Sequence, residues 1–275
     1  MTEKRLKIAL AQLSCGPDVQ KNLSKGLTAM EQAASAGAKL IVFPELSFLP
    51  FLPQKPAEPG YEKWAEPVPG PTFEAIARKA AELKLVTVFN LLEICQGKTY
   101  DSSPVIEADG KLVGLNRMVH VLEAPGFHEK SYYYPGDLGA GVFSTSVGRL
   151  GIAICYDRHF PEYLRALALK GADLVVIPQA GAKGEWPAGL FEAEVQVAAF
   201  QNGYFCGLAN RVGKEPYVEF EGASFVVSPY GQVIAQAKRE EEEILLAEID
   251  FSQLEDCPAR KHFLKDRRPE IYPEL

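Results

Sequence analysis

A cysteine stands where a buried strand gives way to a helix. Residues 150–154 are apolar, the pattern of a strand that is buried on both faces. Pro161 and Glu162 then begin an amphipathic run, and a proline followed by an acid is typical of the first turn of a helix. Cys155 is therefore expected at the carboxyl end of a sheet, where the positive end of a helix dipole favours a thiolate and backbone N–H groups can meet an oxyanion.

Cys155 also has a purely structural interpretation. Free cysteine is among the most buried residue types, and a cysteine in apolar surroundings is chemically inert. The run Tyr156-Asp157-Arg158-His159 that follows it is too polar for a simple core strand. Both interpretations stay open at this point.

Two glutamates could act as the base for such a cysteine. Glu45 follows the apolar residues 40–43 and precedes Leu46, so burial would raise its pKa and suit it to general-base catalysis near neutral pH. Glu129 lies between aromatic residues in a Pro-Gly loop. The alternatives are a surface carboxylate for Glu45, and for Glu129 an ion pair with Lys130 or an arginine. A cysteine with a carboxylate base and no histidine motif indicates acyl transfer through a thioester.

The elements that must position these residues alternate along the chain. Helices are expected over residues 18–35, 72–83, 163–170 and 190–202. Strands are expected over residues 6–13, 40–43, 86–95, 112–121, 172–178, 204–209, 224–228 and 244–249, and a long loop over 48–71. Each half of the chain has two helices, so the pattern predicts an α/β fold with two facing sheets in a four-layer α-β-β-α sandwich.

The composition is that of a globular protein with no affinity for polyanions. The 275 residues are 47% hydrophobic and carry a net charge of −7, so we expect a single domain over residues 1–275 and no nucleic-acid or membrane partner. No apolar run approaches the roughly 18 residues that span a bilayer, and the apolar run after residues 1–7 is too short for a signal peptide.

The cysteines and histidines bear on metals and on the cellular compartment. The five cysteines include no C-x-x-C pair, which argues against disulfides and zinc sites and favours the reducing cytoplasm. The four histidines show no i, i+4 metal-binding spacing. We therefore predict no metal and no cofactor.

Several ordered motifs together resemble the nitrilase, or carbon–nitrogen hydrolase, superfamily, and its β-ureidopropionase and N-carbamoylputrescine amidase branch above all. They are Phe43-Pro44-Glu45, Arg117-x-x-His120, Pro125-Gly126-x-x-Glu129, Pro135-Gly136-Asp137, Cys155-Tyr156-Asp157-Arg158-x-Phe160-Pro161-Glu162, Ala209-Asn210-Arg211-Val212-Gly213 and the tail over residues 263–270. The resemblance covers essentially the whole chain. It implies the four-layer fold, a homodimer that pairs two sandwiches, and hydrolysis of a non-peptide C–N bond through a cysteine thioester.

The resemblance also implies roles for individual residues. Glu45 would be the base, Cys155 the nucleophile and Glu129 a second glutamate of the site. The backbone N–H of Tyr156 would be one oxyanion donor. Met118 stands where the family has a lysine, whose ammonium group stabilises the oxyanion and helps to hold the cysteine as a thiolate. Losing one such donor costs roughly 3–4 kcal/mol of transition-state stabilisation.

Three further residues are candidates for substrate binding. Arg158 could bind a substrate carboxylate bidentately, or could instead pair with Asp157 or Glu162. Trp186, in a Gly-rich loop, could line a pocket or pack in the core. His120 is one place from which the missing positive charge could come.

The leading hypothesis is a cytoplasmic, homodimeric amidohydrolase for a small amide or N-carbamoyl substrate, slowed or redirected by Met118. A second hypothesis is a catalytically silent member that binds an amide or carboxylate ligand without turnover. A third, a glutaminase-like domain that feeds ammonia to a synthetase, is weakened because no second domain is evident in the sequence.

Overall fold

The computed structural model describes residues 5–271; residues 1–4, which begin the N-terminal segment considered above, and residues 272–275 lie outside the described part. Seven strands form the first sheet, in the order β17-β1-β2-β3-β5-β4 with β6 paired to β5. They are β1 (Arg5–Gln12), β2 (Leu40–Val42), β3 (Val86–Val88), β4 (Leu91–Cys95), β5 (Lys98–Ile106), β6 (Leu112–Arg117) and β17 (Glu243–Asp250).

The second sheet has six strands, in the order β16-β15-β12-β11-β10-β9. They are β9 (Val142–Thr145), β10 (Gly148–Ile152), β11 (Leu174–Gln179), β12 (Phe205–Asn210), β15 (Phe225–Val227) and β16 (Val233–Gln236). Two small hairpins stand apart from both sheets, β7 (Glu123–Ala124) with β8 (Phe127–His128) and β13 (Val212–Lys214) with β14 (Glu219–Glu221).

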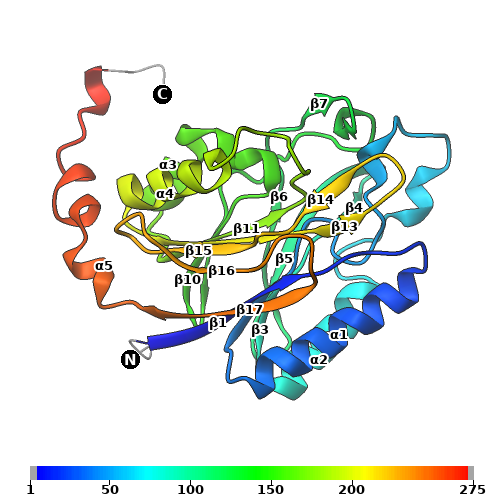
Figure 1. The fold of residues 1–275 in the computed structure, drawn as a ribbon, viewed down its shortest axis with the longest axis horizontal. Coiled ribbons are helices and arrows are strands. Elements are labelled where there is room, and N and C mark those ends of the chain that lie inside the picture. Colours follow the sequence, from blue (N-terminus) through cyan, green and yellow to red (C-terminus); the bar gives the residue numbers. More distant parts are fainter. Residues whose placement is uncertain (1–4, 272–275) are drawn as a thin grey trace.

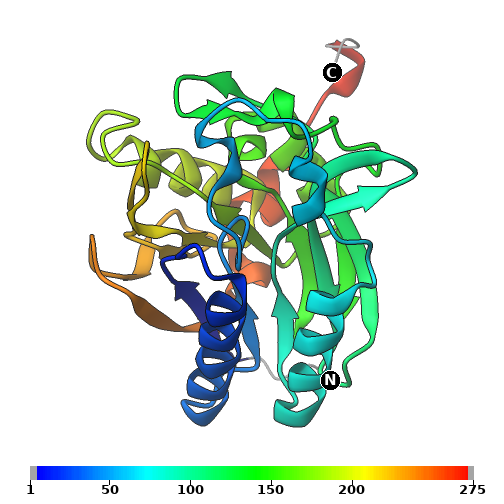
Figure 2. The same cartoon turned by 90° about the vertical axis from the view of Figure 1, so that its right-hand side faces the viewer.

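The helices cover the outer faces of the two sheets and complete four layers, which confirms the predicted α-β-β-α sandwich. Helices α1 (Val19–Ser35) and α2 (Pro71–Leu83) lie side by side against the first sheet (Figures 1 and 2). Helices α3 (Pro161–Leu169) and α4 (Leu190–Asn202) lie against the second sheet, on the opposite side of the molecule (Figure 1).

The layers follow from the alternation of side chains along the central strands. In β1, Ile8 and Leu10 enter the core between the sheets, whereas the intervening Ala9 packs toward α1 and α2. In β11, Val176 enters the same central core and Val175 packs toward α3 and α4. Strands buried on both faces read as continuous apolar runs, which is why the sequence pattern identified them.

Three of the predicted elements differ from what the structure shows. The strand expected over residues 86–95 is two strands, because the chain breaks at Asn90, whose side chain bonds the loop after β2. The extended segment expected over 112–121 ends at Arg117. The loop over 48–71 contains two 3₁₀ turns, η1 (Leu52–Gln54) and η2 (Tyr61–Trp64), and α2 begins at its last residue.

The C-terminal segment leaves the sandwich after β17. The short helix α5 (Gln253–Asp256), the π-helical turn η5 (Ala259–Phe263) and the 3₁₀ turn η6 (Pro269–Ile271) run past the end of α4 (Figure 1). Within residues 5–271, no helix is both long enough and apolar enough to cross a membrane.

Candidate active site

Cys155 lies in a strained turn at the end of the second sheet. Strand β10 ends at Ile152, and the 3₁₀ turn η4 (Cys155–His159) separates it from α3. Cys155 therefore lies in the turn between a strand and a helix that begins at Pro161, as the sequence had suggested. Its φ of 41° is in the left-handed region, which costs an ordinary residue about 1–2 kcal/mol. Such strain persists only where the surrounding structure enforces it, and it clusters at functional sites.

Three loops bring the Cys155 thiol together with two glutamates. Glu45 follows β2, and Glu129 begins the 3₁₀ turn η3 (Glu129–Ser131). The Cys155 sulfur and one carboxylate oxygen of each glutamate all lie within 4.8 Å of one another. Both glutamates are fully buried, and Cys155 is 5% exposed. Residues 26 to 110 positions apart in the sequence thus meet at one edge of the sandwich.

Asp101 adds a third carboxyl group that the sequence analysis missed. It lies in β5, where its Oδ1 accepts a hydrogen bond of 2.5 Å from Asn90 Nδ2. Its carboxyl group faces that of Glu45 closely enough to form a hydrogen bond when one of the two is protonated. The available signal was an acidic residue in the middle of a strand. We call Glu45, Asp101 and Glu129 the carboxyl cluster.

Several polar atoms of this site have no fixed hydrogen-bond donor. Among the described residues, no amide, amine or hydroxyl group donates to either oxygen of Glu45, to Oδ2 of Asp101 or to Oε1 of Glu129. The other oxygen of Glu129 accepts from the backbone N–H of Leu122 at 2.9 Å. The hydroxyl group of Tyr133 is also buried without a partner, although buried polar groups are usually paired.

Burial and mutual repulsion shift the acidity of these groups upward. Burial, followed by the charge of Glu129, raises the pKa of Glu45 to about 8. Burial, then the charge of Glu45, raises the pKa of Asp101 well above its usual value. Burial likewise raises the pKa of Glu129, although the hydrogen bond from the backbone N–H of Leu122 has a smaller, lowering effect. Each of the three carboxyl groups therefore holds its proton to a higher pH than an ordinary carboxyl group does.

The thiol of Cys155 is shifted in the same direction. Burial and the charges of Glu45 and Glu129 raise its pKa, against the smaller effects of the Arg158 charge and the Ala180 backbone N–H. The expectation of a thiolate held by a helix dipole is therefore wrong for the free protein. The thiol needs a base at the moment of attack, and Glu45 is close enough to accept its proton.

Met118 sits in the same buried core as Cys155, held by its neighbours in the chain. Its backbone N–H donates to the carbonyl of Asp101, and its carbonyl accepts from Gly136. Arg117 makes a bidentate pair with Glu93 at 2.6 and 2.8 Å and a further ion pair with Asp137. The Pro-Gly-Asp motif thus clamps the end of β6.

Two buried arginines lie close to the cluster, and both have partners of their own. Arg211 donates to the backbone carbonyls of Glu45 and Leu46 and pairs with Glu215 at 2.5 Å. Arg158 donates to the backbone carbonyl of Cys155 and pairs with Glu194.

The ion-pair partner of Arg158 is neither of the two that the sequence suggested. Glu194 belongs to α4, so the ion pair involves neither Asp157 nor Glu162. The Nη2 atom of Arg158 is buried without a hydrogen-bond partner. One N–H group of this side chain therefore remains available within the described part of the chain.

His120 and Tyr156 support the turn that carries the cysteine. The backbone N–H and the Nδ1 atom of His120 both bond Asp157 Oδ1, at 3.0 and 2.8 Å. The ring of His120 stacks on Phe160 with centroids 3.5 Å apart, and the ring of Tyr156 packs edge-on against Phe160. Asp157 thus ties the chain after β6 to η4.

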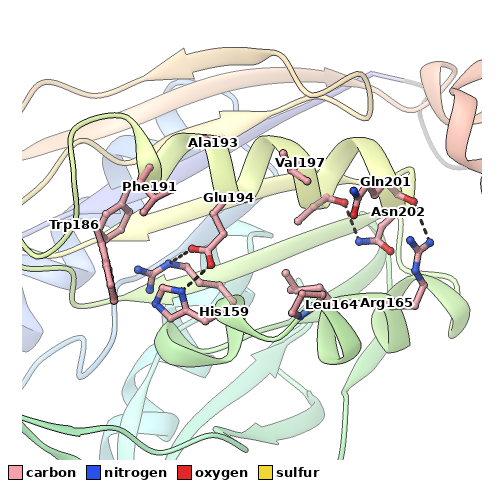
Figure 3. Close-up of a pocket in the computed structure, with 14 residues that line it drawn as sticks. His159, Leu164, Arg165, Trp186, Phe191, Ala193, Glu194, Val197, Gln201 and Asn202 are labelled. Atoms are coloured by element: carbon pink, nitrogen blue, oxygen red, sulfur yellow. Dashed lines mark hydrogen bonds and ion pairs between the residues drawn. The ribbon is translucent and has the colours of Figure 1, made fainter. Parts of the chain in front are cut away.

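Trp186 is 40% exposed and lines a cavity of about 440 Å³ between α3 and α4. Figure 3 shows Trp186 at one end of this cavity, beside the Glu194 carboxylate, which faces His159. Of the predicted site residues, Trp186 and Arg158 line the cavity, and Arg158 alone also contacts Cys155.

The cysteine sulfur and the two glutamate oxygens are also close enough together to be considered as metal ligands. The histidine spacing in the sequence gave no sign of such a group. A buried thiol beside a buried carboxylate is equally an arrangement for nucleophilic attack on an electrophilic carbon, with the carboxylate as the base.

Comparisons with known proteins agree with this chemistry. The model of the carbon-nitrogen hydrolase family matches residues 7–259. An N-carbamoylputrescine amidase from Solanum lycopersicum is 33% identical, over 100% of this chain and 97% of that protein. A citrullinase from Francisella tularensis is 31% identical, over 98% of both chains.

Solved structures are similar over the same extent. A crystal structure of a carbon-nitrogen hydrolase from Helicobacter pylori has a TM-score of 0.92 at 31% identity, over 98% of both chains. A mutant amidase from Nesterenkonia sp. AN1 has a TM-score of 0.83 at 26% identity, over 98% of this chain and 96% of that one. That amidase shows covalent addition of the acetamide moiety of fluoroacetamide at its active-site cysteine.

Proposed function

The chain belongs to the carbon–nitrogen hydrolase family, whose members are hydrolytic enzymes, and we propose that it hydrolyses a small amide or N-carbamoyl substrate through a thioester on Cys155. One observation carries this proposal: the Cys155 sulfur lies within 4.8 Å of carboxylate oxygens of both Glu45 and Glu129. The covalent addition at the cysteine of the Nesterenkonia amidase supports a covalent route.

The proposal assigns a group to each step. Glu45 accepts the thiol proton while the sulfur of Cys155 bonds the carbonyl carbon, and the C=O pair becomes an oxyanion. The protonated Glu45 then gives its proton to the leaving nitrogen as the C–N bond breaks. Water attacks the thioester, Glu45 takes the proton of that water, and the thiol regains it when the C–S bond breaks.

The other members of the site have supporting roles in this proposal. The backbone N–H of Tyr156 is one donor to the oxyanion. Glu129, fixed by the N–H of Leu122, orients the substrate nitrogen. Arg158 and His120 hold the turn around Cys155, and Trp186 contributes to the wall between α3 and α4.

Met118 is the residue that fits this mechanism least well. A methionine cannot donate a hydrogen bond, and it leaves the amide oxyanion with one cationic donor fewer than the family pattern supplies. The raised pKa of Cys155, and the lack of a lysine or arginine hydrogen bond to the carboxyl cluster within the described residues, favour a second candidate, a silent member that binds an amide or carboxylate ligand without turnover.

We further propose that the protein is a cytoplasmic homodimer that pairs through α3 and α4. These helices expose the large apolar side chains of Leu169, Leu190, Val197 and Phe200, and two of them, Leu190 and Val197, line the 440 Å³ cavity. Contiguous apolar patches of this kind mark association surfaces. The five cysteines are free, which suits a reducing compartment.

An ammonia-release assay with a panel of small amides and N-carbamoyl acids tests the proposed reaction. Turnover should occur, and it should be lost in Cys155→Ser and reduced at least about a hundredfold in Glu45→Gln, because each variant removes one member of the nucleophile–base pair. Binding without ammonia release from any compound would favour the silent member instead.

A further inference from the structure

The carboxyl cluster contains more ionisable carboxyl groups than hydrolysis of a neutral amide requires. That reaction needs one base and one orienting group, yet Glu45, Asp101 and Glu129 present four buried oxygens without a fixed donor. The hydroxyl group of Tyr133 is also buried without a partner, and the charges of all three carboxyl groups and of the thiol contribute to raising its pKa. Leaving buried polar atoms unpaired costs stability, so their persistence indicates a ligand that supplies hydrogen-bond donors.

Among residues 5–271, no lysine or arginine side chain donates a hydrogen bond to this cluster. Arg211 lowers the pKa of Glu45, but its guanidinium group bonds backbone carbonyls and Glu215. Arg158 is paired with Glu194. Met118, which directly follows β6 and whose backbone N–H bonds the Asp101 carbonyl, adds no side-chain donor. An oxyanion formed here would face carboxyl groups rather than a cation, which is unfavourable at close range in a buried site.

We propose that Cys155 attacks the carbon of an amidinium or guanidinium group, and that the N–H groups of this planar cation donate to the carboxyl cluster. The inference rests on the proposed function, because it keeps Cys155 as nucleophile and C–N hydrolysis as the reaction, and it names the substrate class. Planar N–H cations and carboxylates are matched partners, and a buried cation is stable only when it is paired in this way.

The charge balance removes the need for an oxyanion donor. Glu45 takes the thiol proton, the sulfur bonds the amidinium carbon, and the C=N pair returns to nitrogen, which gives a neutral tetrahedral intermediate. The protonated Glu45 then passes its proton to one nitrogen, and ammonia leaves with the C–N electron pair. The remaining group, bound to sulfur, is again a cation that the carboxyl cluster can hold.

Hydrolysis completes the cycle without an outside reactant other than water. Glu45 takes a proton as water attacks the cationic carbon. The C–S bond breaks, the sulfur keeps the electron pair and receives the hydroxyl proton, and an amide or urea is released. The proton left on Glu45 passes to ammonia, so the products are an amide or urea and one ammonium ion.

The cation also brings the catalytic groups into their reactive forms. A positive charge within a few ångström lowers the pKa of a buried carboxyl group and of a thiol. Glu45 and Cys155, whose pKa values burial and mutual repulsion raise in the free protein, are therefore activated when the substrate binds.

A metal ion fits the cluster less well than an extended organic cation. The atoms that are mutually close enough to share one ion belong to Glu45, Glu129 and Cys155, and Asp101 is not among them. The unpartnered oxygens therefore extend beyond the coordination sphere of a single ion. A planar cation with N–H groups on several sides can bond both Asp101 and the Glu45–Glu129 pair.

Matched compounds test the proposal. Butanamidine, butanamide and butyronitrile share one chain, and propylguanidine is matched by propylurea. The wild-type protein should release ammonia from butanamidine and propylguanidine with a kcat/KM at least about tenfold above that for the matched neutral compounds. Intact-protein mass spectrometry should find a nitrogen-retaining adduct on Cys155 with the amidine.

Three substitutions test whether the carboxyl cluster causes the preference for cations. Met118→Lys puts a cation beside the carboxyl groups and should shift the ratio of amidine to amide turnover toward the amide by about a hundredfold, whereas Met118→Leu keeps the charge unchanged and should preserve the ratio. Asp101→Asn, which is nearly isosteric, should raise KM for propylguanidine at least about tenfold more than KM for propylurea. Thermal melting of each variant monitors the fold.

The outcomes separate this inference from the proposed function. Turnover of butanamide, propylurea or butyronitrile in preference to the matched cations would overturn the inference and leave Cys155 hydrolysis standing. A stoichiometric divalent metal in the purified protein that is lost in Cys155→Ala would overturn it too. No turnover of either class, with no adduct on Cys155, would overturn both.

Discussion

The fully buried guanidinium group of Arg211 donates to the backbone carbonyl of Glu45, 166 residues earlier in the chain, at 3.0 Å. The same side chain bonds the carbonyls of Leu46 and Leu49 and pairs with Glu215. Arg211 directly follows β12 in the second sheet, and it therefore fixes the loop after β2, which belongs to the first sheet. This relationship explains how a base in one half of the chain keeps its place beside a nucleophile in the other.

Arg211→Lys should lower both stability and activity. Lysine cannot reach three carbonyls and a carboxylate together, and Glu215 loses its partner in a buried place, so the free energy of unfolding should fall by about 3–5 kcal/mol. Because Glu45 loses its anchor, kcat/KM should fall further than the unfolded fraction explains. Urea unfolding and ammonia-release kinetics measure the two effects.

Arg260→Lys is the matched control for this variant. Arg260 also bonds backbone carbonyls, those of Gly203 and Ala172, but it lies on the C-terminal segment away from the cluster. It should lower stability modestly and leave kcat/KM of the folded fraction unchanged. Equal kinetic losses in both variants would contradict the anchoring role of Arg211.

The sequence predicted the sandwich well because the information for it is local. Apolar runs, the N-cap Asp18 and the turns at Gly-containing pairs each identify one element, and two helices per half then allow one layered arrangement. The strand break at Asn90 was missed because its cause is tertiary, a side chain that bonds the loop after β2.

The site could be predicted only in part, for the same physical reason. Cys155, Glu45 and Glu129 each follow a recognisable motif. Asp101 was missed because it becomes chemically significant only when it faces Glu45. The prediction of the ion-pair partner of Arg158 was wrong because α4 brings Glu194 from a distant segment. Contacts between segments far apart in the sequence, and the pKa shifts that burial causes, have no local pattern.

The pH dependence of kcat/KM should report the ionisation of Glu45. The carboxyl must be ionised to accept the thiol proton, and burial raises its pKa to about 8 from the ordinary 4.5. Activity should therefore rise about tenfold per pH unit below this value and level off above it. A profile that is flat between about pH 6 and 8 would contradict Glu45 as the base.

Asp101→Asn should stabilise the protein, and more so at higher pH. Burial raises the pKa of Asp101 in the folded state above its ordinary 3.8, so the unfolded state releases this proton first and the stability of the wild type falls as pH rises between the two values. An asparagine has no proton to lose. Urea unfolding should show a gain of about 1–3 kcal/mol at pH 8 that shrinks at pH 5; a gain that grows toward acid pH would contradict the assignment.

Val197→Glu should separate the proposed dimer. Val197 is 52% exposed in the middle of the α4 face, and a charge there would be desolvated on pairing. Sedimentation velocity should give about twice the chain mass of 30.2 kDa for the wild type and the chain mass for the variant. Leu112→Glu, on β6 of the other sheet, is the control and should stay dimeric. A monomeric wild type at micromolar concentration would rule out this interface.

The central claim is that Cys155 carries the substrate as a covalent intermediate. Acid quenching within one turnover, followed by intact-protein mass spectrometry and peptide mapping, measures this directly for whichever compound releases ammonia. The account predicts one adduct per chain, located on Cys155 and absent in Cys155→Ala, with accumulation in variants that slow the attack of water. Turnover that persists in Cys155→Ala, or an adduct that maps to another cysteine, would contradict it.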